Sequence, residues 1–276
     1  MGKVISVLNF KGGVGKTTTA VNLAAALHRT GKKVLVVDCD SQRNATFILD
    51  RDKDVDETLY TSLEAIAKRQ PNSGLSIFEH EEGFDFVPGD IELKGIDVLL
   101  DKVLSREKQL KRLLSGPRND YDYVLIDCPP NAGMMTVNAM VASDSLLIPI
   151  DSQPMALDGL ADIIALYNEI KSDLNKGLTI LGYLLTRYRK NYATCAEVVN
   201  FLQARKGAYL LNTYIRENIT IGKAAGKRMT IYEYDPESRG ANDYLLLAEE
   251  ITNHQQTHPL TPPSMEGSIM NANVNN

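Results

Sequence analysis

Residues 9–18 read Asn-Phe-Lys-Gly-Gly-Val-Gly-Lys-Thr-Thr. This glycine-rich run lies between an apolar, strand-like segment at residues 4–8 and a segment with helical spacing of apolar residues at 20–27. Its three glycines let consecutive backbone N–H groups curve around an oxyanion, because no Cβ atom stands in the way. This order of strand, glycine loop and helix is typical of a loop that binds the phosphates of a nucleotide.

The end of the run supplies the charge and the hydroxyl that a triphosphate site needs. A helix that starts near Lys16 directs the positive end of its dipole at the phosphates. Lys16 offers a mobile cation to the terminal phosphates, and Thr17 offers a hydroxyl to a magnesium ion. We therefore expect the chain to bind a nucleoside triphosphate through Lys11, Gly12, Gly13, Val14, Gly15, Lys16, Thr17 and Thr18.

The loop departs from the standard phosphate-loop spacing at two positions. Phe10 stands where the standard pattern has a glycine, and a second lysine, Lys11, stands beside it. Lys11 cannot easily fold back onto phosphates that its own loop already surrounds. Two interpretations remain: Lys11 reaches across a two-fold interface to the nucleotide of a second subunit, or it is a solvated surface lysine.

Composition sets the outer limits of function. The chain has 276 residues, 43% of them hydrophobic, and a net charge of −5, so affinity for nucleic acid requires a local basic patch. Its three cysteines show no Cys-x-x-Cys spacing, which favours a reducing cytosol over a disulfide framework or a zinc site. No apolar run approaches the ~18 residues of a membrane span, and the N-terminus leads directly into a strand. We expect a cytoplasmic protein that does not bind membranes.

Strand and helix patterns alternate along the chain. The unbroken Val, Leu and Ile runs at 33–38 and 123–128 are typical of strands covered by helices on both faces. We therefore predict an α/β fold with a doubly wound, mostly parallel sheet, in one domain over residues 1–253, and a disordered tail over 254–276. Residues 50–85 read as an elaborated loop region with a helix inside. The predicted strands are 3–8, 33–38, 123–128, 145–150, 179–185 and 210–215, and the predicted helices are 16–30, 94–115, 154–175, 191–206 and 241–254.

Three aspartates follow the predicted strands at the edge where ligands of open α/β sheets bind. Asp38 and Asp40 follow the run 33–37, and Asp127 follows the run 123–126. Asp127 suits a water-mediated hold on magnesium, and one of Asp38 and Asp40 can support the metal while the other positions the attacking water. An aspartate at a strand end is also a common helix cap, but three together with the glycine loop favour a catalytic site.

Three motifs resemble those of the deviant-Walker ATPases of the ParA/Soj/MinD superfamily: residues 11–18, Asp38-x-Asp40-x-Gln42, and residues 123–130. Residues 215–218 and 234–241 are similar to the ParA/Soj branch, which partitions plasmids and chromosomes. The resemblance covers roughly residues 1 to 252 and implies a P-loop NTPase fold. One departure is Ser41, where many relatives carry proline.

The resemblance also implies a mechanism and partners. It implies an ATP-dependent homodimer with magnesium, in which Lys16 contacts its own nucleotide, Lys11 that of the partner, and Asp40 orients the attacking water. Thr17, Asp38 and Asp127 are the expected metal residues, and Arg187, Arg216 and Asn218 match the region near the adenine. This chain is expected to be a slow ATPase that a ParB-like centromere-binding protein stimulates. Its ATP dimer is expected to bind nonspecific double-stranded DNA and to associate with the nucleoid.

The DNA-binding residues are sought in a basic segment. Residues 187–228 hold nine basic and two acidic side chains, a local charge of +7 in an acidic chain. Apart from the resemblance, such a run is most often a solvated surface. Phosphate contacts by these residues give affinity that depends on salt and hardly on sequence. The candidates are Arg189, Lys190, Lys223, Lys227 and Arg228.

Three other classes of protein are alternatives to a partition ATPase. A MinD-like membrane ATPase ends in a basic amphipathic helix, whereas this chain has no Lys or Arg after Arg239. An iron–sulfur reductase needs cysteine thiolates on a dimer axis, and the pattern places Cys195 on an apolar helix face. A small-molecule ligase or kinase could use the same loop, but no substrate-binding constellation accompanies it.

Overall fold

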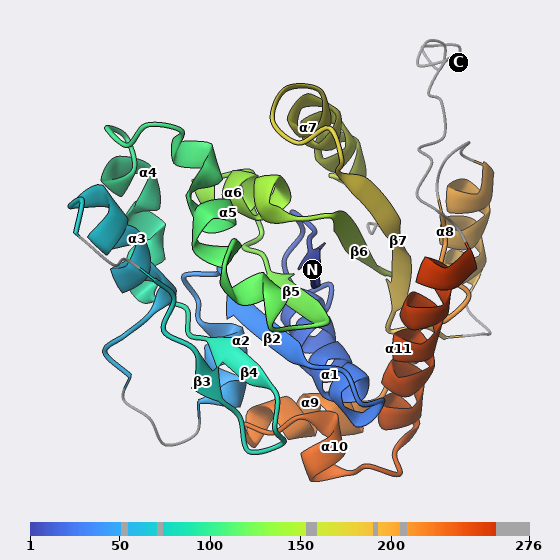
Figure 1. The fold of residues 1–276 in the computed structure, drawn as a ribbon. Helices are drawn as coiled ribbons and strands as arrows, with labels where there is room; N and C mark the ends of the chain where they lie inside the picture. The colour runs from blue at the N-terminus through green and yellow to red at the C-terminus, as the bar shows by residue number, and fades with distance from the viewer. Residues whose placement is uncertain (51–54, 71–73, 153–158, 190–192, 205–208, 258–276) are drawn as a thin grey trace, which may run out of the picture.

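The fold is a single seven-stranded sheet with helices on both faces (Figure 1). The computed structural model describes residues 1–50, 55–70, 74–152, 159–189, 193–204 and 209–257. Neighbouring strands are parallel except for the antiparallel pair β3–β4, which confirms the predicted mostly parallel, doubly wound sheet. The strand order is β3-β4-β2-β5-β1-β6-β7, with bounds β1 Lys3–Val7, β2 Val34–Asp38, β3 Phe78–Glu79, β4 Asp85–Val87, β5 Tyr123–Asp127, β6 Ser145–Asp151 and β7 Thr179–Thr186.

Strands and helices alternate along the chain as predicted, but the predicted helices do not include Asn44–Leu49, Met134–Ala142, Ile219–Gly226 and Ile231–Tyr234. The α-helices are α1 Lys16–Arg29, α2 Asn44–Leu49, α3 Leu59–Ala67, α4 Ile96–Leu99, α5 Gln109–Leu114, α6 Met134–Ala142, α7 Leu160–Asp173, α8 Ala193–Ala204, α9 Ile219–Gly226, α10 Ile231–Tyr234 and α11 Arg239–Thr257. Short 3₁₀ turns, η1 Ile91–Gly95, η2 Arg106–Lys108 and η3 Pro117–Asn119, occur between α3 and β5. Helix α3 is the helix expected inside residues 50–85.

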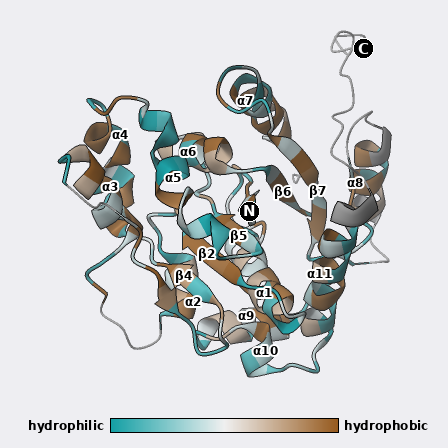
Figure 2. Cartoon of the chain, viewed as in Figure 1, coloured by the Kyte–Doolittle hydropathy of each residue, from teal (hydrophilic) through white to brown (hydrophobic). Residues whose placement is uncertain are grey.

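The core has two layers because successive strand residues face opposite sides of the sheet. In β1, Val4 packs into one apolar cluster with α5, α6 and α7, and Ile5 packs into a second cluster with α1 and α11. Both side chains are fully buried. The strands are coloured largely hydrophobic in Figure 2, as expected for a sheet covered on both faces. The strand ends therefore remain as the places where polar side chains can form a site.

The structure corrects three element predictions. Residues 94–115 are not one helix, because Ser105 adopts a left-handed φ of 53° and η2 separates α4 from α5. Residues 210–215 are not a strand, because the N–H groups of Asn212 and Thr213 donate to the Glu250 carboxylate at 2.8 and 2.7 Å instead of to a neighbouring strand. Isolated β-bridges remain at each end of this segment, from Leu210 to Tyr183 and from Arg216 to Tyr188. Strand β3 lies in the stretch 50–85 expected to be an elaborated loop region, and β4 begins at its last residue.

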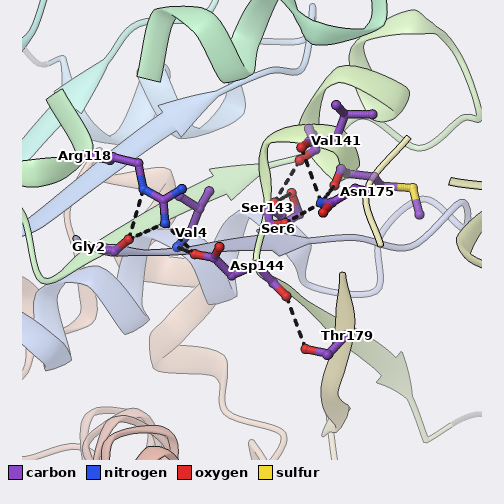
Figure 3. Close-up of polar contacts among 11 residues, drawn as sticks. Gly2, Val4, Ser6, Arg118, Val141, Ser143, Asp144, Asn175 and Thr179 are labelled. Carbon is purple, nitrogen blue, oxygen red and sulfur yellow. Dashed lines mark hydrogen bonds and ion pairs between the residues drawn. The ribbon is translucent and has the colours of Figure 1, made fainter. Parts of the chain in front are cut away.

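A polar network fixes the N-terminal edge of the sheet (Figure 3). Arg118 donates two hydrogen bonds to the Gly2 carbonyl and one, of 2.7 Å, to Asp144 Oδ2. The same Asp144 oxygen accepts the Val4 N–H at 2.8 Å, and the Asp144 carbonyl accepts the N–H of Thr179. The starts of β1, β6 and β7 are thereby joined at the edge opposite the glycine loop.

The end of the fold differs slightly from the predicted boundary at residue 253. Helix α11 continues to Thr257, so the predicted tail begins inside this helix, and residues 258–276 lie outside the described residues. Among the described residues, no helix has both the length and the apolar character that crossing a membrane requires.

Candidate nucleotide site

The predicted site residues meet at the carboxyl ends of the central strands. Asp38 at the end of β2 is in register with Asp127 at the end of β5, which is in turn in register with Val7 of β1. The glycine loop leaves β1 at this edge and enters α1 at Lys16. Parallel strands thus bring the loop and the two aspartates, which are far apart in sequence, to one place.

The backbone of the glycine loop has the conformation that its residues predict. Gly13 and Gly15 have φ values of 75° and 88°, in the left-handed region that favours glycine. A Cβ on Gly12 or Gly13 would meet nothing within 4 Å, so this side of the loop faces open space. The Asn9 side chain braces the loop, since Nδ2 donates to the Pro149 carbonyl at 2.8 Å and Oδ1 accepts the Lys11 N–H at 2.9 Å.

Lys16 extends along the inside of the loop. Its side chain is buried, and Nζ donates to the Lys11 carbonyl at 3.1 Å. Burial lowers the pKa of Lys16, and the nearby Asp127 carboxylate opposes this effect. A buried ammonium group that donates to a neutral carbonyl gains from an anion placed against the loop.

Thr17 and Asp127 form the second half of the site. The Thr17 hydroxyl donates to Asp127 Oδ2 at 2.6 Å, and Asp127 Oδ1 is buried with no hydrogen-bond donor among the described residues. Burial raises the pKa of Asp127 well above its ordinary value, and the Asp38 charge raises it further. A buried carboxylate oxygen without a donor, beside a hydroxyl, is a suitable environment for a hard divalent cation.

Asp38 and Asp40 differ in how the protein uses them. Asp38 Oδ2 accepts the N–H and the hydroxyl of Thr46 at 2.9 and 2.7 Å, and its Oδ1 accepts the Asp40 N–H. Burial raises the pKa of Asp38 to about 6, although the bonds from Thr46 oppose the shift. The Asp40 carboxylate accepts the Gln42 N–H through Oδ1 at 3.0 Å. Asp38 thus organises the loop after β2 through three hydrogen bonds, whereas the Asp40 carboxylate accepts one bond, from Gln42, among the described residues.

The residues expected near the adenine are engaged in contacts within the protein. Arg187 at the end of β7 has a φ of 51° and forms a 3.0 Å ion pair with Asp151, yet its side chain remains 51% exposed. Arg216 forms a two-pronged ion pair with Asp243 of α11, and Asn218 caps α9 through the Thr220 N–H. Arg187 is therefore the more exposed of the two arginines, since the Arg216 side chain is 39% exposed and joins its loop to α11.

The five basic DNA-binding candidates have different environments. Arg189 is exposed but paired with Glu217, and Arg228 donates to the Phe47 and Asp50 carbonyls while covering the Phe47 ring. Lys190 lies outside the described residues. Lys223 of α9 and Lys227, which directly follows this helix, are both exposed one turn apart, and neither forms an ion pair within the described part of the chain.

The structure adds residues that the sequence reasoning missed. Asp151 is buried at the end of β6, where its Oδ1 has no hydrogen-bond donor within the described ranges, and Thr186 at the end of β7 donates to the Val14 carbonyl at 2.9 Å. Both stand directly at the end of apolar strand runs, the signal that identified Asp38 and Asp127. Asn9 carries no such signal, because its two hydrogen bonds depend on tertiary placement.

All three cysteines are free and buried. Burial raises the pKa of Cys39 well above its ordinary value and that of Cys128 to about 12, so both remain neutral thiols. Cys195 contacts the Ser152 carbonyl beneath α8. This placement does not suit an iron–sulfur cluster shared at a subunit surface, which requires accessible thiolates.

This chain is similar to known proteins over more than nine-tenths of its length. A family model described as an AAA domain matches residues 2–180. The sporulation initiation inhibitor protein Soj of Bacillus subtilis is 39% identical over 254 residues, which are 91% of this chain and 98% of that protein. The chromosome partitioning protein ParA of Caulobacter vibrioides is 32% identical over 256 residues, covering 92% of this chain and 95% of that protein.

A solved structure shares the architecture and holds ligands. The crystal structure of a protein described as cobyrinic acid a,c-diamide synthase from Mycobacterium smegmatis contains an ATP analog and magnesium. It superposes with a TM-score of 0.82 at 27% identity, covering 96% of this chain and all of that chain.

Proposed function

The chain belongs to the ParA/Soj family of partition ATPases, and we propose that it acts in plasmid or chromosome partition as an ATP-dependent dimer. In this proposal the chain binds ATP with Mg²⁺ at the glycine loop. The ATP dimer binds DNA without sequence preference, and a ParB-like partner stimulates hydrolysis. The membership rests on relatives that match more than nine-tenths of the chain.

One observation carries the nucleotide part of the proposal: the Thr17–Asp127 hydrogen bond beside the buried Lys16 and the open side of the glycine loop. The residues present fit a magnesium nucleotide. Lys16 is a desolvated cation that lies against the glycine loop, and Asp127 Oδ1 is a buried oxygen with no donor in the described part of the chain. Each of these groups gains a partner of opposite charge when phosphates and a divalent cation are present.

The chain's own residues then have distinct tasks. Lys16 and the backbone N–H groups of 12–17 hold the phosphates, while Thr17 and Asp127 hold the metal, with Asp38 supporting the end of β2 behind them. A bound Mg²⁺ supplies neutralisation of phosphate charge. Asp40 orients and accepts a proton from the attacking water, the role that its less committed carboxylate suits. Lys11 acts on the nucleotide of the partner subunit.

DNA binding is proposed for the surface of α9. Lys223 and Lys227 present two cations on one exposed face in a segment of locally positive charge, and a two-fold dimer doubles this surface. Arg228 contributes by holding α9 against α2, and Arg189 is available once it leaves Glu217. The membrane alternative has no specific observation in its favour among the described residues. The ligase alternative draws on the architecture shared with the protein described as a cobyrinic acid a,c-diamide synthase, but the 27% identity to it is lower than the 39% identity to Soj.

The experiment separates binding from turnover. Lys16→Ala removes the cation against the phosphates and is expected to abolish measurable ATP binding in isothermal titration. Asp40→Ala is expected to bind ATP normally and to release phosphate about 10²-fold more slowly, the lower end of a general-base contribution. Lys33→Ala, an exposed lysine at the opposite edge of the sheet, is the control for loss of charge. Normal phosphate release by Asp40→Ala would remove that residue from the proposed role.

A further inference from the structure

A second cavity lies away from the nucleotide site, between α3, α5 and the loop that joins α4 to η2. Its volume is ≈ 490 Å³, within the range of about 300–1,000 Å³ that small-molecule sites occupy. None of the residues assigned to the nucleotide site lines it. Its wall is apolar at Ile66, Val103 and Leu113, and basic at Arg69, Lys102 and Arg112.

The three basic residues of this cavity have no acidic partner among the described residues. No carboxylate of the described chain lines the cavity, although the whole chain carries a net charge of −5. None of the three forms an ion pair with a carboxylate of the described residues. Two basic residues just outside the cavity are paired, Lys68 with Glu64 at 2.9 Å and Arg106 with Asp101 at 3.5 Å. The cavity therefore gathers positive charge that the described residues do not neutralise.

A buried glutamine lies behind one wall of the cavity and holds two of the residues that line it, Leu104 and Arg112. Gln109 is fully buried, and its amide nitrogen donates to the carbonyls of Leu104 and Ser105 at 3.0 and 2.7 Å. Its amide oxygen accepts a hydrogen bond from Arg112 at 3.4 Å. One side chain thus fixes both the loop that closes the cavity and the direction of one guanidinium group.

The opposite wall holds an arginine in a sparsely populated backbone conformation. Arg69 has a φ of 54°, which costs a non-glycine residue of the order of 1 kcal/mol. Its N–H donates to the Ile66 carbonyl at 2.9 Å, and this bond at the end of α3 holds the conformation. A less costly conformation would direct this side chain elsewhere, so the turn sets the position of the cation.

We propose that this cavity is a second ligand site, which binds a small organic anion. The phosphate or carboxylate groups of the ligand face Arg69, Lys102 and Arg112, because guanidinium groups pair with such oxyanions in a two-pronged geometry. Its apolar body lies against Ile66, Val103 and Leu113. This inference is independent of the proposed function, since the two sites share no residue.

The probe for the test is 5-amino-2,4,6-triiodoisophthalate, an aromatic ring that carries two carboxylates. We expect isothermal titration of the full chain to give one bound molecule, and the iodine anomalous signal of a soaked crystal to lie in this cavity. Arg69→Gln with Arg112→Gln is expected to weaken binding tenfold or more, as roughly follows from the loss of two charge-assisted hydrogen bonds. The matched control, Lys68→Gln with Arg106→Gln, removes the same charge beside the cavity and is expected to stay within about twofold.

A competition experiment distinguishes an organic ligand from a bare anion. Phenyl phosphate is expected to displace the probe, whereas inorganic phosphate at the same concentration is not, because it has no apolar body. Four outcomes would each overturn the proposal. They are equal affinity of the cavity and control double variants for the probe, an iodine signal elsewhere in the crystal, equal displacement of the probe by inorganic phosphate, and no binding at millimolar probe concentration. Circular dichroism of both double variants establishes that they are folded.

Discussion

The Thr17 hydroxyl donates a 2.6 Å hydrogen bond to Asp127, joining the first turn of α1 to the end of β5. The two residues are 110 positions apart in the chain, and the parallel pairing of β1 with β5 brings them together. The bond occupies one oxygen of the carboxylate and leaves the other buried without a donor from the described residues. The pair therefore presents a hydroxyl oxygen and a carboxylate oxygen at the place where the glycine loop opens.

The first prediction concerns magnesium. Thr17→Ala removes the hydroxyl and is expected to weaken binding of Mg-ATP roughly tenfold, while ATP affinity in EDTA changes little. Thr17→Ser keeps the hydroxyl and serves as the control. Titrations with and without magnesium measure the difference, and an equal loss of affinity in both conditions would show that Thr17 supports the loop rather than the metal.

The second prediction concerns Lys11, whose backbone is held by Asn9 and Lys16. In an Asp40→Ala background with ATP and magnesium, we expect a stable dimer in light scattering. Adding Lys11→Ala is expected to return the protein to a monomer that still binds ATP, because the cation acts on the other subunit's nucleotide. Adding Lys33→Ala instead is expected to leave the dimer intact. A dimer that persists without the Lys11 side chain contradicts a role in trans.

The third prediction concerns stability at the N-terminal edge of the sheet. Asp144→Ala is expected to lower the free energy of unfolding by about 2 kcal/mol, since it leaves the Val4 N–H without its acceptor and Arg118 without its carboxylate partner. Asp144→Asn keeps an acceptor for Val4 and is expected to cost less. Arg106→Ala, which breaks an exposed ion pair, is expected to cost no more than about 0.5 kcal/mol. Urea denaturation measures all three, and equal losses would mean that the network of Figure 3 contributes nothing.

The edge of the sheet that carries the glycine loop could be predicted from the sequence because its signals are local. The glycine loop needs φ values that the glycines at 13 and 15 adopt, and Asp127 follows an apolar run that can only be a buried strand. The same reasoning applied to the run 145–150 would have identified Asp151. Strands β3 and β4 escaped prediction because two and three residues carry no periodicity.

The basic residues could not be sorted by sequence, because charge alone does not reveal the partner. Arg216 and Arg228, expected on ligands, bind Asp243 and the α2 carbonyls in the folded chain. Asn9 binds a carbonyl that is distant in the sequence, and Gln109 binds carbonyls of an irregular loop. Lys223 and Lys227 were among the five candidates from the sequence, and the structure singles them out because they are exposed and the described residues offer them no ion pair.

The last prediction assigns DNA binding to α9. Lys223→Glu with Lys227→Glu is expected to weaken binding of random-sequence duplex DNA, while ATP-dependent dimerisation survives. The log–log slope of affinity against salt should fall by about 1 for each DNA phosphate that no longer has a lysine beside it. Lys94→Glu with Lys111→Glu makes the same change of charge at exposed positions between α3 and β5 and is expected to bind DNA as the wild type does. Arg228→Glu is a poor probe, because it also breaks the hydrogen bonds that hold α9 to α2.

The most direct test of the proposed function is the affinity of the unaltered chain for random-sequence duplex DNA with Mg-ATP, with Mg-ADP and without nucleotide, each over a series of salt concentrations. We predict tight binding with Mg-ATP alone, at the protein concentrations where a dimer forms, with affinity that falls steeply as salt rises. Equal DNA binding in all three nucleotide conditions, or binding indifferent to salt, would contradict the proposal.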